Sequence, residues 1–206
     1  MTTDYKEAIN YYAKVLLPET GAREGMREVL KKLKEIGFFT APASSVFHLN
    51  VPGGLAAHSI SVYEVAMRLK TVVVEMRPEL EERLSDESIA IAALLHDVCK
   101  SQVYKPVRKR RKDPDGCWRD YDGYDVDYHD FPMGHGEKSV IMLLMYGLKL
   151  TEDEMVAIRW HMSAWDLPFQ SAEEKSSLNA AKEKCPLLTL LQCADGMSAG
   201  MLESPS

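Results

Sequence analysis

Six side chains that can bind a metal ion lie in apolar stretches of the sequence, where polar groups are uncommon. They are four histidines and two aspartates: His58, His96, Asp97, His135, His161 and Asp195. His96 and Asp97 are adjacent in the segment ALLHD, and Asp195 lies in LLQCADGMS. A buried carboxylate without a partner costs several kcal/mol, so each aspartate should face a cation, a hydrogen-bond network or a metal ion.

Taken one at a time, these residues have a simpler interpretation. A single histidine on an apolar helix is usually a core residue hydrogen-bonded to a backbone carbonyl, and a single buried aspartate is usually a cap or half of an ion pair. Six such groups in one small domain are difficult to satisfy separately, whereas a shared metal cluster satisfies them together. Imidazole-rich sites favour Fe, Mn, Co, Ni or Zn over Mg or Ca, which prefer oxygen ligands. We therefore expect divalent transition-metal ions.

The segments that carry these residues have the periodicity of helices. One helix is expected from about Ala56 to Met76, because Pro78 cannot continue it. The next opens at Asp86 as the N-cap residue and contains IAIAALLHDVCK, which is apolar on nearly every side. A helix of this kind should lie at the centre of the domain.

Further helices are expected before and after these two. An amphipathic stripe with spacings of three and four precedes Gly37: Met26, Val29, Leu30, Leu33 and Ile36. Later helices are expected in HGEKSVIMLLMYGL, after a capping box of Thr151 and Glu154, and from Pro186 onward. With no series of strands, the sequence predicts an all-α helical bundle around a buried metal site.

Residues 104–134 have a different character. The basic octet KPVRKRRK, Lys105 to Lys112, is followed by a stretch rich in Asp, Gly, Pro and Tyr. We expect a long irregular loop that has room for a short hairpin, and loops of this length in compact domains are usually functional or mobile. If the loop folds over the site, the octet could recruit a nucleotide or an RNA end. Four aromatic residues are then available to stack on a base: Tyr104, Trp118, Tyr121 and Tyr124.

Length and composition indicate the number of domains and the state of the cysteines. The chain has 206 residues, enough for one domain. We expect a single domain with a core from about 53 to 199, N-terminal helices over 1–52 packed on that core, and a frayed tail over 201–206. Four cysteines without a CxxC pair indicate reduced, mostly buried thiols.

The charge and hydropathy pattern restrict partners and location. The net charge is −6, and six of the 25 basic residues lie in the octet. An acidic surface of this kind repels polyanions, so a phosphate-bearing substrate must be attracted by local positive charge or by metal. The longest apolar run is too short to span a membrane, and the N-terminus lacks the pattern of a secretory signal. The expected location is the cytoplasm, and the sequence leaves the oligomeric state open.

The six metal-binding candidates resemble a known pattern. In order and context, His58, the pair His96 and Asp97, and Asp195 are similar to the H…HD…D motif of the HD-domain superfamily of metal-dependent phosphohydrolases. His135 and His161 match the extra histidines of its two-metal members. The resemblance extends from about Gly53 to Ala199. It implies a helical fold around a dinuclear site.

The resemblance also implies a role for each residue. One ion would be held by His58, His96, Asp97 and Asp195. Asp97 would bridge the two ions, and His135 and His161 would complete the ligands of the second ion. Lys100 follows the dyad by one helical turn, where similar two-metal proteins place a lysine that contacts the substrate phosphate or the attacking water. Asp97 and Lys100 are thus the expected catalytic residues, and Lys100 the expected substrate-binding residue. An alternative for Lys100 is a helix-terminal lysine favoured by the helix dipole.

The expected activity is hydrolysis of a phosphomonoester or phosphodiester, of a nucleotide or related small molecule, by a hydroxide activated by two divalent ions. Similar ligand sets occur in di-iron oxygenases related to myo-inositol oxygenase, and the ligands alone do not separate the two classes. A non-catalytic regulatory module is a further alternative. A 3′ exoribonuclease is also possible in principle, although a companion OB-type domain is missing.

Several other residues receive weaker assignments. His48 and His129 match no motif position and are expected in polar loops. Glu137, Lys138 and Asp166 are candidates for orienting His135 and His161 through hydrogen bonds. Trp160 and Trp165 are expected in the core or in a pocket wall.

Overall fold

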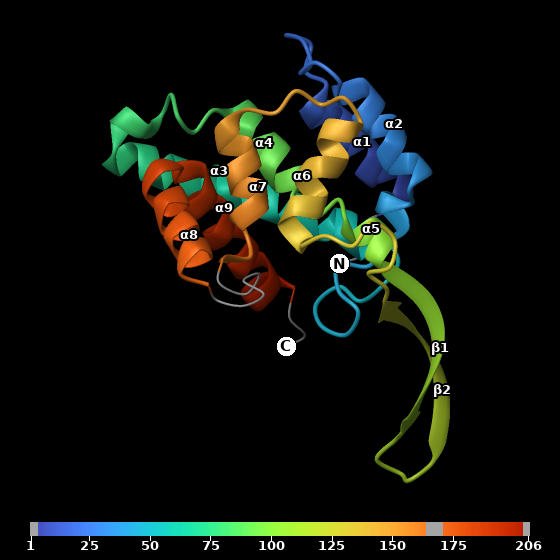
Figure 1. Cartoon of the computed structure of the whole chain (residues 1–206). Helices are drawn as coiled ribbons and strands as arrows, with labels where there is room; N and C mark the ends of the chain where they lie inside the picture. The colour runs from blue at the N-terminus through green and yellow to red at the C-terminus, as the bar shows by residue number, and fades with distance from the viewer. Residues whose placement is uncertain (1–3, 164–170, 204–206) are drawn as a thin grey trace.

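A computed structural model describes residues 4–163 and 171–203 of the chain. It is a helical body from which one β-hairpin projects (Figure 1). The principal helices are α1 (Tyr5–Leu16), α2 (Met26–Glu35), α3 (Gly54–Met76), α4 (Asp86–Leu95), α5 (Lys100–Val103), α6 (His135–Met145), α7 (Glu152–Trp160), α8 (Ala172–Lys184) and α9 (Pro186–Met197). Short 3-10 turns, η1 (Phe38–Thr40) and η2 (Pro78–Leu80), lie on either side of α3, and a π-helical turn, η4 (Ser198–Leu202), follows α9.

Helix α4 lies at the centre of the body, as its apolar sequence predicts. All of its residues from Ile89 to Leu95 are buried, and α3, α7 and α9 pack around it. The cap differs from the prediction, because the side chain of Ser85, not Asp86, accepts the hydrogen bond from the Ser88 amide. In the N-terminal part, the hydroxyl of the buried Tyr12 in α1 donates a hydrogen bond to the Leu94 carbonyl at 3.0 Å. This bond ties α1 to the central helix.

The short hairpin that the sequence allows within residues 104–134 is present, so the expectation of a purely α fold is only partly correct. Strand β1 (Tyr104–Lys112) pairs antiparallel with β2 (Trp118–Val126), from Tyr104 opposite Val126 to Lys112 opposite Trp118. Both strands are largely exposed and highly charged, so they lack the alternation of buried and exposed side chains that identifies strands in a sequence. The strands pair through their backbones, and oppositely charged side chains face each other across the pair.

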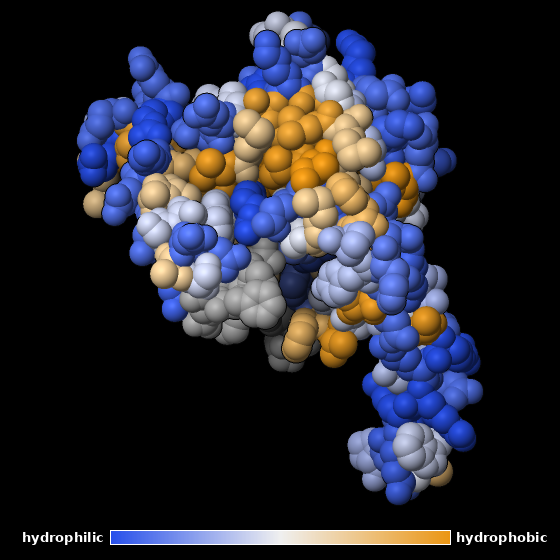
Figure 2. Space-filling model, in the orientation of Figure 1, coloured by the Kyte–Doolittle hydropathy of each residue, from blue (hydrophilic) through white to orange (hydrophobic). Residues whose placement is uncertain are grey.

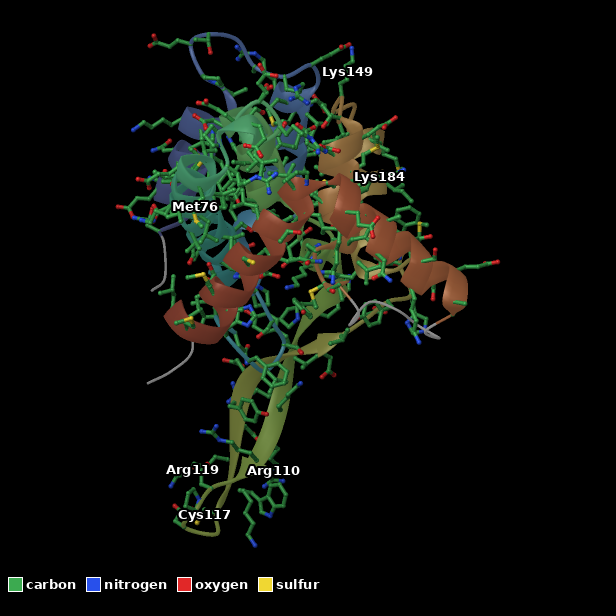
Figure 3. The ribbon with its side chains drawn as sticks, turned by 90° about the vertical axis from the view of Figure 1, so that its left-hand side faces the viewer. Met76, Arg110, Cys117, Arg119, Lys149 and Lys184 are labelled. Atoms are coloured by element: carbon green, nitrogen blue, oxygen red, sulfur yellow. The ribbon has the colours of Figure 1, made fainter. Side chains whose placement is uncertain are left out.

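Cross-strand ion pairs neutralise much of the basic octet. Nη1 of Arg108 lies 2.9 Å from Oδ1 of Asp122, and Nζ of Lys109 lies 2.9 Å from Oδ1 of Asp125. The guanidinium group of Arg110 covers the ring of Trp118 with 5.7 Å between the guanidinium carbon and the ring centroid. The cations and aromatic rings that could bind a nucleic acid therefore already contact one another. The hairpin is hydrophilic along its length (Figure 2), and Figure 3 shows Arg110, Cys117 and Arg119 at its far end, away from the helices.

The surface of the helical body carries an apolar patch. Figure 2 shows apolar side chains gathered over α6 and α7. The residues there include Val140, Ile141, Leu144, Met145, Met155 and Val156. Within the described ranges, every helix is too short or too polar to cross a membrane.

Residues 201–203, the described part of the expected frayed tail, are packed on the helical body. Met201 and Leu202 belong to the η4 turn, and the side chain of Glu203 is only 6% exposed. The four cysteines form no disulfide; Cys99 and Cys185 are buried, whereas Cys117 and Cys193 are exposed. The expectation that the thiols are mostly buried therefore holds for only half of them.

Helices α6 and α7 approach each other closely at Gly136. A Cβ atom at this position would lie 2.2 Å from the carbonyl oxygen of Arg159, which is far inside van der Waals contact. Gly136 directly follows His135, and Arg159 lies two residues before His161. The missing side chain therefore allows the two helix ends that carry these histidines to lie side by side.

We expect Gly136→Ala to destabilise the protein by about 1–3 kcal/mol, because the added methyl group must push α6 away from the α7 backbone. Gly196→Ala is the matched control: this glycine lies within α9 and a Cβ there would have no atom within 4 Å. The control should be neutral or slightly stabilising. Urea unfolding of the metal-free proteins measures both, and equal free energies of unfolding for the two variants would contradict the close-approach argument.

Candidate metal centre

The structure brings all six predicted metal ligands together, although they come from five separate parts of the chain. Most of them lie at the ends of helices, where a side chain can reach the centre of the body. His58 lies in the second turn of α3, His96 and Asp97 in the turn after α4, His135 at the first position of α6, His161 directly after α7, and Asp195 in the last turn of α9. The sequence places the dyad within the central helix, but α4 ends at Leu95, so His96 and Asp97 lie in the turn directly after it.

The carboxylate of Asp97 is the centre of this cluster, and its two oxygens face different histidines. Oδ1 lies 2.5 Å from Nε2 of His135 and 3.4 Å from Nε2 of His161. Oδ2 lies 3.2 Å from Nε2 of His96 and 3.8 Å from Nε2 of His58. The side chain of Asp97 is only 2% exposed. One carboxylate therefore lies between two pairs of imidazoles.

Asp195 approaches the same cluster from α9. Its Oδ1 lies 3.2 Å from Nε2 of His58. Three overlapping groups of three ligand atoms lie within 4.8 Å of one another: His58, His96 and Asp97; Asp97, His135 and His161; and His96, His161 and Asp195. This spacing allows the six side chains to hold metal ions.

Backbone carbonyls orient two of the imidazoles. Nδ1 of His96 lies 2.8 Å from the carbonyl oxygen of Ala93, and Nδ1 of His161 lies 2.7 Å from that of Ile158. Because a carbonyl only accepts, Nδ1 must carry the hydrogen, and in the neutral ring Nε2 is left with a free lone pair. Both Nε2 atoms are buried and have no hydrogen-bond partner.

Side chains orient the other two imidazoles. Nδ1 of His58 lies 2.9 Å from Oε2 of Glu203, and Nδ1 of His135 lies 3.3 Å from the sulfur of Cys99. All four rings are thus held at Nδ1 and present Nε2 to the aspartates. Histidines that bind metal ions almost always have their second nitrogen held in this way. The two buried Nε2 lone pairs without a partner and the mixed nitrogen and oxygen donors fit divalent transition-metal ions.

The electrostatics of the cluster favour charged side chains despite their burial. Burial raises the pKa of the Asp97 carboxyl, but nearby positive charge, above all that of Lys100, outweighs this effect and holds the pKa well below its ordinary range. Burial lowers the pKa of His58, yet hydrogen bonds to Asp195 and Glu203 raise it to about 9.

The same balance applies to His135 and Lys100. Burial lowers the pKa of His135, but Cys99 and Asp97 raise it to about 10. The pKa of Lys100 is also raised, because the attraction of Asp97 outweighs burial. Its Nζ lies 2.6 Å from Asp97 Oδ2, and its side chain is 13% exposed. Without metal, protons and this ammonium group supply the positive charge around Asp97.

Two residues of the cluster are missed by the sequence reasoning. His48, expected in a polar loop, lies between η1 and α3 with its ring centroid 5.0 Å from that of His58. Glu203, expected in a frayed tail, contacts Nδ1 of His58. Neither position has a motif or an apolar helical context that would have identified it. His129 is 98% exposed in the loop before α6, as predicted.

Glu137 and Lys138, two of the three residues expected to orient His135 and His161, have other partners. Glu137 pairs with Arg159 at 2.6 Å, and the buried Lys138 donates a hydrogen bond to the carbonyl oxygen of Asp130 at 2.6 Å. Trp160 is partly buried against the core, as predicted. Asp166 and Trp165 lie outside the described residues.

Comparison with known proteins identifies relatives of the chain. A family model described as HD domain matches residues 55–200. Among curated proteins, the dihydroneopterin 2′,3′-cyclic phosphate phosphodiesterase of Methanocaldococcus jannaschii is 34% identical over 88 residues, which are 43% of this chain and 32% of that protein. The match therefore spans less than half of either protein. No solved structure matches the chain.

We expect uptake of Co(II) or Zn(II) to release protons, and the affinity to rise with pH up to about pH 9 to 10. The raised pKa values of His58 and His135 keep both rings protonated at neutral pH, and a metal ion can bind only after Nε2 has lost its proton. Calorimetric titrations in buffers of different ionisation enthalpy count the protons released. His129→Gln is the control and should release the same number as the unmodified protein; an absence of proton release from the unmodified protein would contradict this account.

Proposed function

The chain belongs to the HD-domain family, and on this basis we propose that it is a metal-dependent phosphohydrolase acting on a phosphate ester of a small molecule. The observation that carries the proposal is the position of Asp97, whose two oxygens each face two imidazole nitrogens. A carboxylate in this position suits a bridge between two metal ions. The name of the Methanocaldococcus jannaschii relative supports phosphodiester hydrolysis.

The proposed site contains two divalent transition-metal ions. One would be held by His58, His96, Asp97 and Asp195, and the other by Asp97, His135 and His161. When bound, such ions lower the pKa of water and neutralise charge on phosphate oxygens. The protein residues hold the imidazoles in place at Nδ1, so that Nε2 does not have to reorient when the site is filled.

Lys100 is proposed as the residue that binds the substrate phosphate. Its ammonium group is fully charged at neutral pH and lies in the cluster beside Asp97. An ammonium group has three donors, and a charge-assisted hydrogen bond to phosphate is roughly twice as strong as a neutral one. Lys100 therefore can bind a phosphate oxygen while it remains close to the carboxylate.

The substrate class is proposed as a phosphodiester or phosphomonoester of a nucleotide or related small molecule. Cyclic phosphodiesters are included because the relative's name specifies a 2′,3′-cyclic phosphate. The ion pairs along the hairpin support a small substrate over RNA, since a phosphate backbone would have to displace aspartates from Arg108 and Lys109.

The proposal is tested with the Mn(II)-, Co(II)- and Fe(II)-loaded protein on a panel of phosphomonoesters, linear phosphodiesters and 2′,3′-cyclic phosphates. We expect metal-dependent phosphate ester hydrolysis that a chelator abolishes. Asp97→Asn should lose metal and activity together, by at least about 100-fold, because the proposed bridge and one of the two carboxylate ligands are removed. Asp127→Asn is the matched control, since Asp127 contacts His129 outside the cluster.

The alternatives give different results in the same experiment. Oxygen consumption by the Fe(II) protein on polyols, without hydrolysis, would favour the oxygenase class. A protein that binds metal and hydrolyses no member of the panel would favour a regulatory module. Either outcome would overturn the proposed activity.

We expect Lys100→Met to lower kcat/KM by about 10- to 100-fold, as the loss of a charged hydrogen bond worth about 1.5–3 kcal/mol predicts. Metal affinity should be unchanged or higher, because the ammonium group competes with metal ions for Asp97 Oδ2. The control Lys105→Met removes an exposed lysine next to Asp130 and should have full activity. Loss of bound metal from Lys100→Met would instead assign Lys100 to the integrity of the site.

A further inference from the structure

Glu203 makes an unusual contact for a residue so near the end of the described chain. Its Oε2 and Oε1 atoms lie 2.9 and 3.1 Å from Nδ1 of His58. The side chain of Glu203 is 6% exposed and that of His58 is 1% exposed. A carboxylate buried to this extent needs a strong hydrogen-bond partner, and the nearest imidazole nitrogen is that of His58.

The contact completes a pattern in the cluster. In His96 and His161 the nitrogen Nδ1 is held by the backbone carbonyl three residues earlier. The ring of His58 is held instead by a charged side chain from a distant part of the chain. A carboxylate acceptor holds the hydrogen on Nδ1 and makes Nε2 a stronger base, which a neutral carbonyl does to a smaller extent.

The local backbone explains how Glu203 reaches α3. The η4 turn is π-helical, and the amide of Glu203 donates to the carbonyl of Ser198 at 3.0 Å. The hydroxyl of Ser61 in α3 donates to the hydroxyl of Ser198 at 3.0 Å. The wider turn and this bond place the end of η4 against α3, one turn from His58.

We infer that Glu203 is a positioning residue for the metal centre: its carboxylate accepts a hydrogen bond from Nδ1–H of His58 and so directs Nε2 toward Asp97 and Asp195. This inference rests on the metal site of the proposed function and deepens it. It makes the metal affinity of the site dependent on the C-terminal turn, because the turn must form before Glu203 can orient His58.

His48 lies on the other side of the same carboxylate. Its Nε2 is 3.9 Å from Glu203 Oε2, which is beyond hydrogen-bond distance. The Glu203 carboxylate therefore hydrogen-bonds to His58 and not to His48, and we expect Glu203 to orient the ring of His58.

The test measures Co(II) affinity of the full chain by competition with a chromophoric chelator. Glu203→Ala should raise the Co(II) dissociation constant about 10- to 100-fold, the range expected when the hydrogen-bond partner of a metal ligand is removed. Glu203→Gln should fall between Glu203→Ala and the unmodified protein, since its amide oxygen accepts a hydrogen bond without the charge. This second variant keeps the side-chain volume in case Glu203→Ala does not fold.

A second readout reports on His58 itself. In the Zn(II)-loaded protein, the Nδ1 proton of His58 should give a hydrogen-bonded NMR signal that exchanges slowly with water. Glu203→Ala should lose this signal while those of His96 and His161, which are held by backbone carbonyls, persist. A merely structural role of Glu203 would affect the three signals alike.

Glu64→Ala is the matched control because it removes a glutamate carboxylate from α3 that contacts Tyr11 and Arg68 and lies outside the cluster. It should change the Co(II) dissociation constant by no more than about twofold. An equal loss of affinity in Glu64→Ala and Glu203→Ala would overturn the inference, as would unchanged affinity in both Glu203 variants; in the latter case the proposed function would stand. An unmodified protein that binds no Co(II) would overturn both.

Discussion

The burial of the Asp97 carboxylate is the constraint on which the rest of the structure depends. A buried anion is tolerated only when positive charge and hydrogen-bond donors surround it. Here that surrounding consists of four imidazoles and the ammonium group of Lys100, delivered by segments far apart in the sequence. The helices of the body pack so that the ends that carry the ligand side chains meet at this carboxylate. The polar cluster therefore lies at the end of the apolar central helix α4, on the border of the apolar core.

This arrangement separates the functions of the two imidazole nitrogens. Each Nδ1 is tied to the protein, by carbonyls for His96 and His161 and by Glu203 and Cys99 for His58 and His135. Each Nε2 faces the shared centre. A site prepared in this way loses little conformational freedom when a ligand binds, which raises its affinity. Close backbone contacts serve the same end, since Gly136 brings α6 against α7 and sets the distance between two of the rings.

The hairpin is stabilised differently from the helical body. It has little apolar surface to bury, and isolated two-stranded hairpins are only marginally stable in water. Cross-strand ion pairs such as Arg108 with Asp122, and stacking of Arg110 on Trp118, take the place of a core. Surface ion pairs contribute little individually, so the hairpin is held by several of them acting together. A search for alternating apolar residues does not detect a strand of this kind.

Much of the helical body can be predicted from the sequence, because apolar periodicity identifies helices. The six candidate ligands can also be predicted, because polar residues within apolar runs are energetically unfavourable unless they bind a common partner. The capping box of Thr151 and Glu154, for example, depends only on residues three positions apart and is present as predicted. Contacts between distant segments are of another kind. The roles of Glu203 and His48 beside His58, and the division of Asp97 between two pairs of rings, depend on how whole helices pack. No local pattern encodes such a contact, since its energy arises only when separate segments, up to 145 residues apart for Glu203 and His58, meet in the folded interior.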